Sequence, residues 1–218
     1  MERWYLSLEL NIVQQLKMET TEEKYYAPFG ENNFLHVYNR TNSEKDLLFY
    51  KKKNYSYFLR KYHEYLSTYL DTYAFCLIPN HFHLMVRVKS IEKLAHANTN
   101  ESIAEQFRKF FISFSQAINK QEGRRGSLFQ KRFKRVAVKD ASHFTQLIYY
   151  IHFNPVYHKI VKNLADYRWS SYKAILSTKR TEITRKKVLE WFGNRNQFED
   201  FHVNYQIEKV KQYLMIEN

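Results

Sequence analysis

The chain has 218 residues, 44% hydrophobic and 17% aromatic, which is enough to fill the core of one domain with an appendage and excludes a disordered tail. Thirty-five Lys and Arg residues against 22 Asp and Glu residues give a formal net charge of +13, which favours a nucleic-acid partner. The single Cys76 excludes a disulfide framework and a cysteine zinc site. Because no apolar stretch of about 18 residues and no signal peptide are visible, we expect a cytoplasmic protein without a membrane partner.

The first third of the chain predicts an extension, a strand and a helix. Residues 1–27 show no readable pattern, and we expect an N-terminal extension there. A strand is expected at about 34–39. A helix follows at about 53–70, where Phe58, Leu59, Tyr62, Leu66 and Tyr69 recur at helical spacing.

A hairpin that presents two histidines is the next predicted element. Residues 73–78 form an apolar run, Pro79 and Asn80 supply turn residues, and a second run begins at His81. Strand side chains alternate between faces, so His81 and His83 share one face, and Phe82, Leu84 and Val86 share the other. Two imidazoles aimed the same way suit a divalent metal. The alternative is two ordinary half-buried histidines, which are common in proteins.

A helix and a strand follow, joined by a strongly basic segment. A capping box at 102–105 predicts a helix start, and the stripe of Ile103, Phe107, Phe110, Phe111, Phe114 and Ile118 predicts its core face. A strand is expected at about 135–139. From the end of this helix through the strand runs the basic cluster of Lys120, Arg124, Arg125, Lys131, Arg132, Lys134, Arg135 and Lys139, interleaved with Phe129 and Phe133. Rings among cations suit single-stranded nucleic acid, whereas the alternative is a solvated loop around Gly123 and Gly126.

A helix from about Ser142 carries two adjacent tyrosines, and Pro155 is expected to end or kink it at Asn154. Residues four apart share a helix face, so Tyr150 lies beside Asn154, and Tyr149 beside Phe153. The amide oxygen of Asn154 can join two imidazoles as ligands of a metal that polarises a phosphate. The phenol of Tyr150, beside Asn154, can then attack that phosphate as a nucleophile. Ordinary packing of these tyrosines is the alternative.

The C-terminal part predicts two short helices. One runs over about 184–192 and ends at Gly193, and the other is indicated by Ile207, Val210 and Leu214. We expect three units: the extension at 1–27, a domain at 28–178 and a helical appendage at 179–218.

Four blocks in this order resemble the single-tyrosine HUH transposases, and among them the REP-associated tyrosine transposases. They are Leu35 to Arg40, Leu77 to Leu84, Phe129 to Phe133, and Tyr150 to Val156 followed by Trp169 to Tyr172. The resemblance runs from about Phe34 to Tyr172. The Pro-Asn-His-x-His and Tyr-Ile-His-x-Asn-Pro-Val blocks together are highly specific.

The resemblance implies an α+β, ferredoxin-like antiparallel sheet with helices on one face, plus a helix that carries the catalytic tyrosine. The predicted order of strand, helix, two strands, helix and strand matches it. In this family two histidines, here His81 and His83, bind Mg²⁺ or Mn²⁺, and the tyrosine, here Tyr150, forms a 5′-phosphotyrosyl link to single-stranded DNA. Insertion-sequence members usually carry glutamine as the third ligand, where this chain has Asn154, as the REP-associated branch does. This difference favours a host-domesticated member.

The partner implied is single-stranded DNA with a REP-like hairpin, bound by a monomer or homodimer. The expected DNA contacts are Asn39, Arg40, Arg124, Arg125, Lys131, Arg132, Lys134 and Arg135. Two readings remain open: a DNA nuclease and strand transferase, or a hairpin-binding module with a weak or unused site. A hydrolase that uses water has no visible general-base carboxylate in these motifs and is disfavoured.

Overall fold

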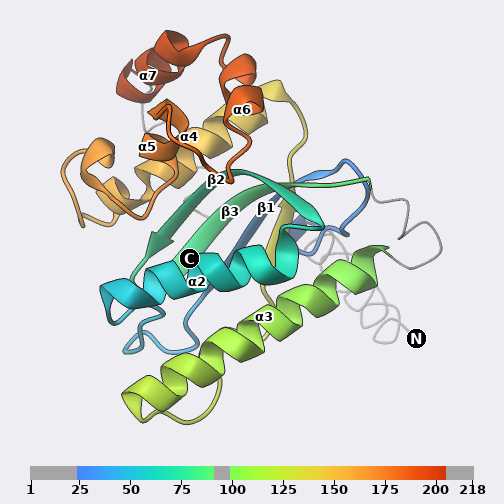
Figure 1. Ribbon diagram of the computed structural model, residues 1–218, viewed down its shortest axis with the longest axis vertical. Helices are drawn as coiled ribbons and strands as arrows, with labels where there is room; N and C mark the ends of the chain where they lie inside the picture. The colour runs from blue at the N-terminus through green and yellow to red at the C-terminus, as the bar shows by residue number, and fades with distance from the viewer. Residues whose placement is uncertain (1–23, 91–98, 205–218) are drawn as a thin grey trace, which may run out of the picture.

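The centre of the fold is a four-stranded antiparallel sheet in the order β2-β3-β1-β4 (Figure 1). The structure, a computed structural model, describes residues 24–90 and 99–204. The strands are β1 (Phe34–Arg40), β2 (Leu70–Ile78), β3 (His81–Val88) and β4 (Lys134–Ala137). Residues 79 and 80 form the tight turn between β2 and β3, which confirms the predicted hairpin.

Two helices, α2 (Lys52–Leu66) and α3 (Thr99–Glu122), cover one face of the sheet (Figure 1). Phe82, Leu84 and Val86 of β3 point into this layer with the apolar stripe of α3, as strand alternation predicts. The predicted end of α2 near residue 70 was wrong, because Leu70 begins β2 and the Tyr69 carbonyl accepts from the Lys89 amide at 2.9 Å. Pairing with β3 therefore overrides the helical pattern there. The predicted start of α3 was also late, since the helix begins at Thr99 and Ser102 lies inside it.

The helix that carries the tyrosines, α4 (Ala141–Tyr157), packs on the opposite face of the sheet. Asp140 caps its start by accepting a hydrogen bond from the His143 amide at 2.8 Å. Of the two predicted effects of Pro155, a helix end at Asn154 was wrong, because α4 continues through Pro155 to Tyr157, and a kink there stays a prediction. Proline removes one backbone donor, and this is tolerated so near the end, where the His158 amide still reaches the Asn154 carbonyl at 3.0 Å. The α+β, ferredoxin-like arrangement is confirmed.

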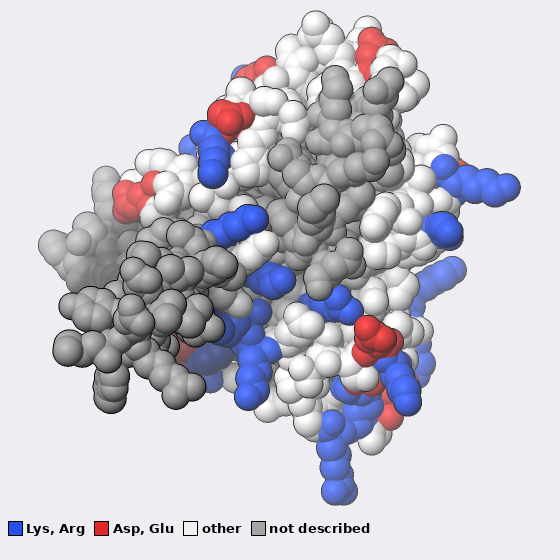
Figure 2. Space-filling view, turned by 180° about the vertical axis from the view of Figure 1, so that it is seen from behind, with Lys and Arg blue, Asp and Glu red and all other residues white. Residues whose placement is uncertain are grey.

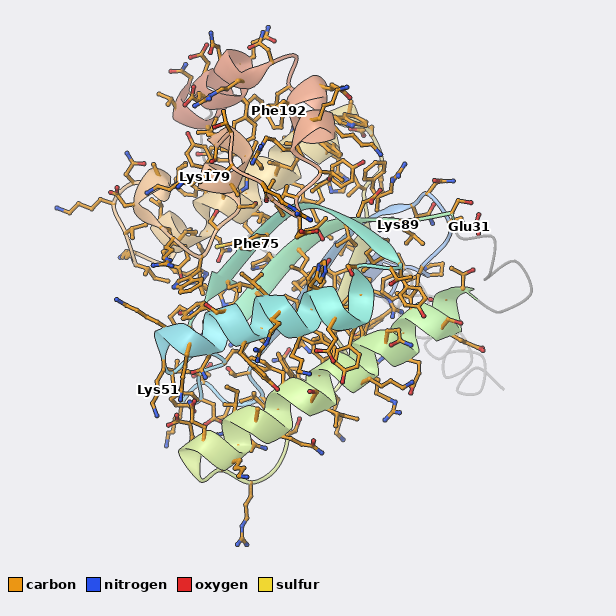
Figure 3. All side chains as sticks on the ribbon, viewed as in Figure 1. Glu31, Lys51, Phe75, Lys89, Lys179 and Phe192 are labelled. Atoms are coloured by element: carbon orange, nitrogen blue, oxygen red, sulfur yellow. The ribbon has the colours of Figure 1, made fainter. Side chains whose placement is uncertain are left out.

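Short helices complete the core around α4. The 3-10 helix η2 (Leu164–Asp166) and α5 (Tyr172–Leu176) lead to α6 (Arg185–Trp191) and α7 (Arg195–Asn204). The prediction of α6 is confirmed, including its end at Gly193, where φ is +93°. Val188 of α6 and Phe198 of α7 share a hydrophobic cluster with Phe144 of α4, and Phe192 lies between α6 and α7 (Figure 3).

The prediction of the C-terminal part was incomplete. The sequence did not predict α7, and the helix expected around Ile207, Val210 and Leu214 lies outside the described residues. The unit boundaries at 27 and 178 stay predictions.

The segment that precedes β1 covers the edge of β4, which the sequence did not predict. Tyr26 forms an isolated parallel bridge with Arg135, and the Ala27 amide donates to the Arg135 carbonyl at 3.0 Å. The Phe29 ring stacks on Phe107 of α3, with 5.4 Å between ring centroids. The outer backbone groups of β4 are thereby partly satisfied, which protects an edge strand from pairing with other chains.

Candidate active site

The two histidines of the hairpin lie at the start of β3 and face α4. His83 is fully buried and His81 is 9% exposed. They alternate with Phe82, whose side chain joins the opposite cluster, so both imidazoles lie on one face as predicted. The turn before them is held because the amides of Leu48 and Phe49 donate to the Pro79 carbonyl at 2.8 and 3.1 Å.

Asn154 of α4 reaches both histidines. Its Oδ1 lies 3.1 Å from Nε2 of His81, and its Nδ2 lies 3.4 Å from Nε2 of His83. The two imidazole rings are 5.1 Å apart and nearly perpendicular. The structure thus brings the three predicted ligands together on the side of the sheet that α4 covers.

Tyr150 lies one helical turn before Asn154 on the same side of α4. Its ring is 5.5 Å from the ring of His83 and approaches it edge-on. The side chain is only 1% exposed, so a DNA phosphate reaches Tyr150 only if the groups around it move. Tyr149 points elsewhere: its ring stacks on Phe153 at 5.4 Å and touches His202 of α7. Helical spacing predicted this difference between the two tyrosines.

His36 of β1 is a functional candidate to which the sequence assigned no role. It is buried, and its Nε2 lies 2.9 Å from Nδ1 of His83. Burial, and then the neighbouring His83 and His143, hold the pKa of His36 well below its ordinary value. Burial, and then His158, lower the pKa of His83 to about 3. Both rings are therefore neutral near pH 7 and offer lone pairs. Because strand alternation places His36 and Tyr38 on one face, the signal was present in the block at 35–40.

His158 is a second candidate that the sequence reasoning missed. It follows Asn154 by four residues at the C-terminal end of α4, and its ring lies 4.8 Å from that of His81. Burial lowers its pKa, and the charge of Arg40 lowers it further. His158 and Arg40 therefore border the side of the site where His81 lies. The available signal was its spacing, four residues after Asn154 and eight after Tyr150, which places all three on one helix face.

The donor atoms fit a divalent cation. Nδ1 of His81 lies 2.9 Å from Oδ1 of Asn80. In the tautomer with its proton on Nδ1, His81 donates to Asn80 and presents the Nε2 lone pair on the side of the Asn154 oxygen. In that tautomer the Nε2 lone pair and the Asn154 oxygen, 3.1 Å apart, are both available to a cation. Among the described residues no three His, Cys, Asp or Glu side chains form a ligating group. The amide of Asn154 is therefore needed to complete the set.

The basic cluster divides into exposed and structural members. Arg125, Lys131 and Arg132 are exposed, and Lys and Arg side chains gather on the face opposite that of Figure 1 (Figure 2). The Arg132 guanidinium lies over the Tyr26 ring at 3.9 Å. Lys134 lies 5.1 Å from the Tyr25 ring and 5.7 Å from Tyr38, whose ring stacks on His36. Cations and tyrosines thus lead from the exposed face toward the histidines.

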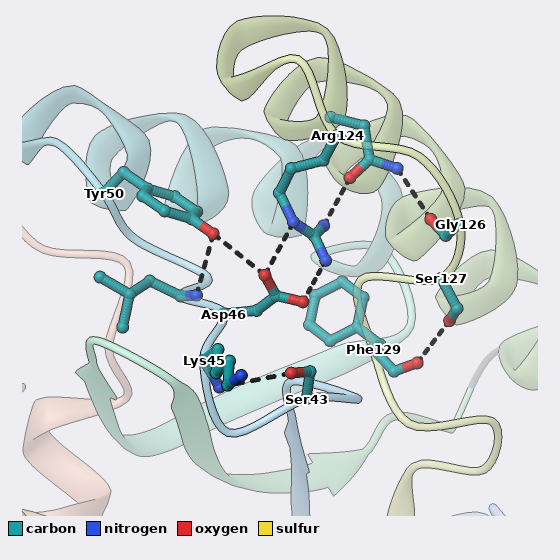
Figure 4. Close-up of polar contacts among 10 residues, drawn as sticks. Ser43, Lys45, Asp46, Tyr50, Arg124, Gly126, Ser127 and Phe129 are labelled. Atoms are coloured by element: carbon teal, nitrogen blue, oxygen red, sulfur yellow. Dashed lines mark hydrogen bonds and ion pairs between the residues drawn. The ribbon is translucent and has the colours of Figure 1, made fainter.

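Other predicted DNA contacts hold the fold together. Arg124 forms an ion pair with Asp46 and donates to Asn119 at 2.7 Å (Figure 4). Arg135 donates to the carbonyls of Ala27 and Tyr26 at 2.9 and 3.3 Å. Asn39 is buried and bonds to Gln130 and Arg40. Their contacts with DNA stay predictions.

The aromatic rings of the basic cluster also differ from expectation. Phe129 is buried, and Phe133 packs against Phe107 and Phe111 of α3. Tyr25 and Tyr26, from outside the cluster, accompany its cations instead. The sequence pattern did not reveal this, because the rings come from a segment more than 100 residues away.

Comparison with known proteins agrees with the motifs. No protein-family model matches the chain. A Haemophilus influenzae protein named as a REP-associated tyrosine transposase is 27% identical over 107 residues, which are 47% of this chain and 58% of the relative. The chain therefore matches less than two thirds of that relative's length. The fold is also similar to a solved structure of a REP-associated tyrosine transposase bound to a REP hairpin. The matched region is 71% of this chain and 86% of the chain in that structure, with 15% sequence identity and a TM-score of 0.57. The resemblance to this group is confirmed, and the structural likeness supports the fold.

Proposed function

We propose that the chain is a REP-associated tyrosine transposase that binds hairpin-bearing single-stranded DNA and cuts it through Tyr150. The observation that carries the proposal is the meeting of His81, His83 and Asn154 beside Tyr150. These residues come from β3 and α4, which the packing of α4 on the sheet brings together. The named relative and the hairpin-bound structure support the class of activity and the partner.

The metal ligands we propose are Nε2 of His81, Nε2 of His83 and Oδ1 of Asn154. A bound Mg²⁺ or Mn²⁺ supplies charge that polarises a phosphate and stabilises the additional negative charge of the transition state. Imidazole ligands suit Mn²⁺ better than Mg²⁺, which prefers oxygen. Burial keeps His83 neutral, and a neutral imidazole is the form that ligates a metal.

Tyr150 acts as the nucleophile in this proposal. Its phenolic oxygen forms a bond to the phosphorus of the scissile phosphodiester, and the bond from phosphorus to the 3′ oxygen breaks. The phenolic proton is lost and the departing oxygen gains one, so the products are a 5′-phosphotyrosyl link and a free 3′-OH. The link conserves one phosphodiester bond, and a 3′-OH of another strand end reverses the reaction without an external energy source.

The exposed basic face provides the DNA-binding surface. Arg125, Lys131 and Arg132 neutralise phosphates, and Tyr25 and Tyr26 offer rings on which unpaired bases stack. The charge of +13 draws DNA to the molecule.

No helix among residues 24–90 and 99–204 is long and apolar enough to span a membrane.

One observation favours a second candidate, a hairpin-binding protein that does not cut. Tyr150 is buried to 1% exposure, and a nucleophile must be reached by its substrate. The proposal of cleavage requires that DNA binding opens the site. Binding without cleavage requires no such change.

One experiment separates the two candidates. Purified protein is incubated with single-stranded hairpins from the flanks of its own gene and Mn²⁺, and the products are resolved on a denaturing gel and, in parallel, on a native gel. Cleavage predicts a covalent protein–DNA band, and a hairpin-binding module predicts a shifted native complex without one. Activity that survives a chelator would contradict the metal-dependent mechanism.

A further inference from the structure

The contact between His36 and His83 lies at the back of the proposed metal site. His36 projects from β1 and His83 from the neighbouring β3, and their ring centroids are 5.1 Å apart with 27° between planes. Nε2 of His36 lies 2.9 Å from Nδ1 of His83, and both side chains are buried. One nitrogen of His83 therefore faces His36 and the other faces Asn154.

The contacts of Asn154 determine where the proton of His83 lies. The Asn154 amide nitrogen only donates, so Nε2 of His83, 3.4 Å away, accepts and carries no proton. The single proton of the neutral ring is then on Nδ1 and is donated to Nε2 of His36. His36 in turn carries its proton on its own Nδ1.

We propose that His36 is a positioning residue, which holds the His83 ring in the tautomer and orientation that direct the Nε2 lone pair to the metal. This inference rests on the proposed function, since it concerns one ligand of the metal site. Histidine ligands generally donate their second ring N–H to an acceptor, which fixes the tautomer and increases basicity. That acceptor is more often a carboxylate or a carbonyl, and in this protein a third histidine takes its place.

The surroundings of His36 support a fixed ring. Its ring also stacks on Tyr38 at 4.6 Å, and Tyr150 approaches it edge-on at 6.1 Å. The Tyr38 ring also lies 5.6 Å from that of His83, so the imidazole of His36 packs in a cluster of three rings near the proposed nucleophile. A side chain without a ring acceptor at this position leaves the Nδ1 proton of His83 buried without its partner, and rotation of the ring or a change of tautomer follows.

The first test reads the tautomer of His83 in the metal-free wild-type protein at pH 8 by long-range ¹H–¹⁵N NMR. We expect the proton on Nδ1 of His83 and an unprotonated Nε2 on His36. The rival arrangement has the Asn154 amide turned over, a proton on Nε2 of His83 and His36 as the donor. Finding that arrangement would overturn the proposal.

The second test measures Mn²⁺ affinity by calorimetry in three variants. His36→Leu removes the acceptor, and we expect about 10- to 100-fold weaker binding, as for other groups that support metal ligands. His36→Gln supplies an amide oxygen in a similar place and should restore most of the affinity. Tyr62→Phe is the matched control, because it removes a buried hydrogen bond to Thr72 from the α2 side of the sheet and leaves the site intact.

The outcomes separate this proposal from the proposed function. Wild-type protein that binds Mn²⁺ and cuts DNA, with unchanged affinity in folded His36→Leu, would overturn only the role of His36. Wild-type protein that has the expected tautomer but forms no covalent DNA adduct would overturn the proposed cleavage and support the positioning contact. If His36→Leu does not fold, the role of His36 is tested by the two other measurements. A proton on Nδ1 of His83 in wild type, with nearly wild-type Mn²⁺ affinity in His36→Gln, supports the role, and a proton on Nε2 of His83 overturns it.

Discussion

Nε2 of His81 lies 3.1 Å from Oδ1 of Asn154, although 73 residues separate them in the chain. His81 belongs to β3 and Asn154 to α4, so the contact joins the sheet to the helix that carries Tyr150. The proposed metal ligands and the nucleophile therefore meet only when α4 is docked on the sheet.

The ligand set predicts that Asn154→Ala weakens Mn²⁺ binding. Removing a group that supports a metal ligand weakens metal binding by about 10-fold or more. Loss of a direct ligand should reduce the Mn²⁺ affinity by at least that much. Activity with Mn²⁺ should equal or exceed activity with Mg²⁺. Calorimetry of wild type and variant checks the affinity, and unchanged binding in folded Asn154→Ala would remove this residue from the set.

The exposed basic face predicts strongly salt-dependent DNA binding. For single strands the logarithmic slope of affinity against salt is about 0.7 per phosphate contact. Replacing Arg132 and Lys134 together by serine should reduce this slope by roughly one to two units. Lys179 and Arg180, in the loop after α5, serve as a matched pair of serine replacements that should leave the slope unchanged. Fluorescence anisotropy across a salt series measures both, and equal effects of the two pairs would place the DNA elsewhere.

Arg124 is predicted to contribute to stability through Asp46 (Figure 4). The two side chains are only 16% and 21% exposed, so their interaction is less screened than a surface ion pair. We expect Arg124→Ala to lower the free energy of unfolding by about 1–3 kcal/mol. A double-mutant cycle with Asp46→Asn, followed by urea unfolding, isolates the pair. Additive effects of the two replacements would show that the contact contributes nothing.

His202 predicts a loss of stability in acid. It donates from Nδ1 to the Phe198 carbonyl at 2.8 Å, and its Nε2 faces Nδ1 of His152 at 2.9 Å, with Tyr149 and Tyr172 against its ring. Burial lowers its pKa from 6.5 to about 4. The stability that neutral His202 contributes to the fold is fully present above pH 6.5, its pKa in the unfolded chain. This stability is lost as the pH falls from 6.5 toward 4, because the unfolded chain then binds the proton more readily.

The size of this effect can be measured with His202→Gln, which does not titrate. Between pH 7 and pH 5 the wild type should lose about 2 kcal/mol more unfolding free energy than the variant. Urea unfolding at both pH values gives the comparison. Parallel losses in the two proteins would assign the acid sensitivity to other groups.

Much of the sheet and of the site was predictable because it depends on short-range periodicity. Alternation along β3 placed His81 and His83 on one face, and the helical repeat placed Tyr150 beside Asn154 and turned Tyr149 toward Phe153. These patterns act within a few residues, so the sequence displays them directly.

The remainder depends on contacts that no local pattern displays. The proline at 155 suggested that the helix ends or kinks at Asn154, but near the C-terminal end of a helix proline removes little hydrogen bonding, and α4 continues past it. The link between His36 and His83 arises from strand pairing across 47 residues. Arg135 looked like a free cation, whereas its guanidinium holds the backbone of Tyr26 and Ala27. Only the tertiary fold assigns these partners.

The site of covalent attachment to DNA decides the proposed mechanism. Wild-type protein, Tyr150→Phe and Tyr149→Phe are each incubated with the single-stranded hairpin and Mn²⁺, and the protein–DNA adduct is digested and mapped by mass spectrometry. We predict an adduct on Tyr150 in wild type and Tyr149→Phe, and none in Tyr150→Phe, which should still bind the hairpin because only one hydroxyl is lost. An adduct on Tyr149, or cleavage by Tyr150→Phe, would contradict the assignment of Tyr150 as the nucleophile.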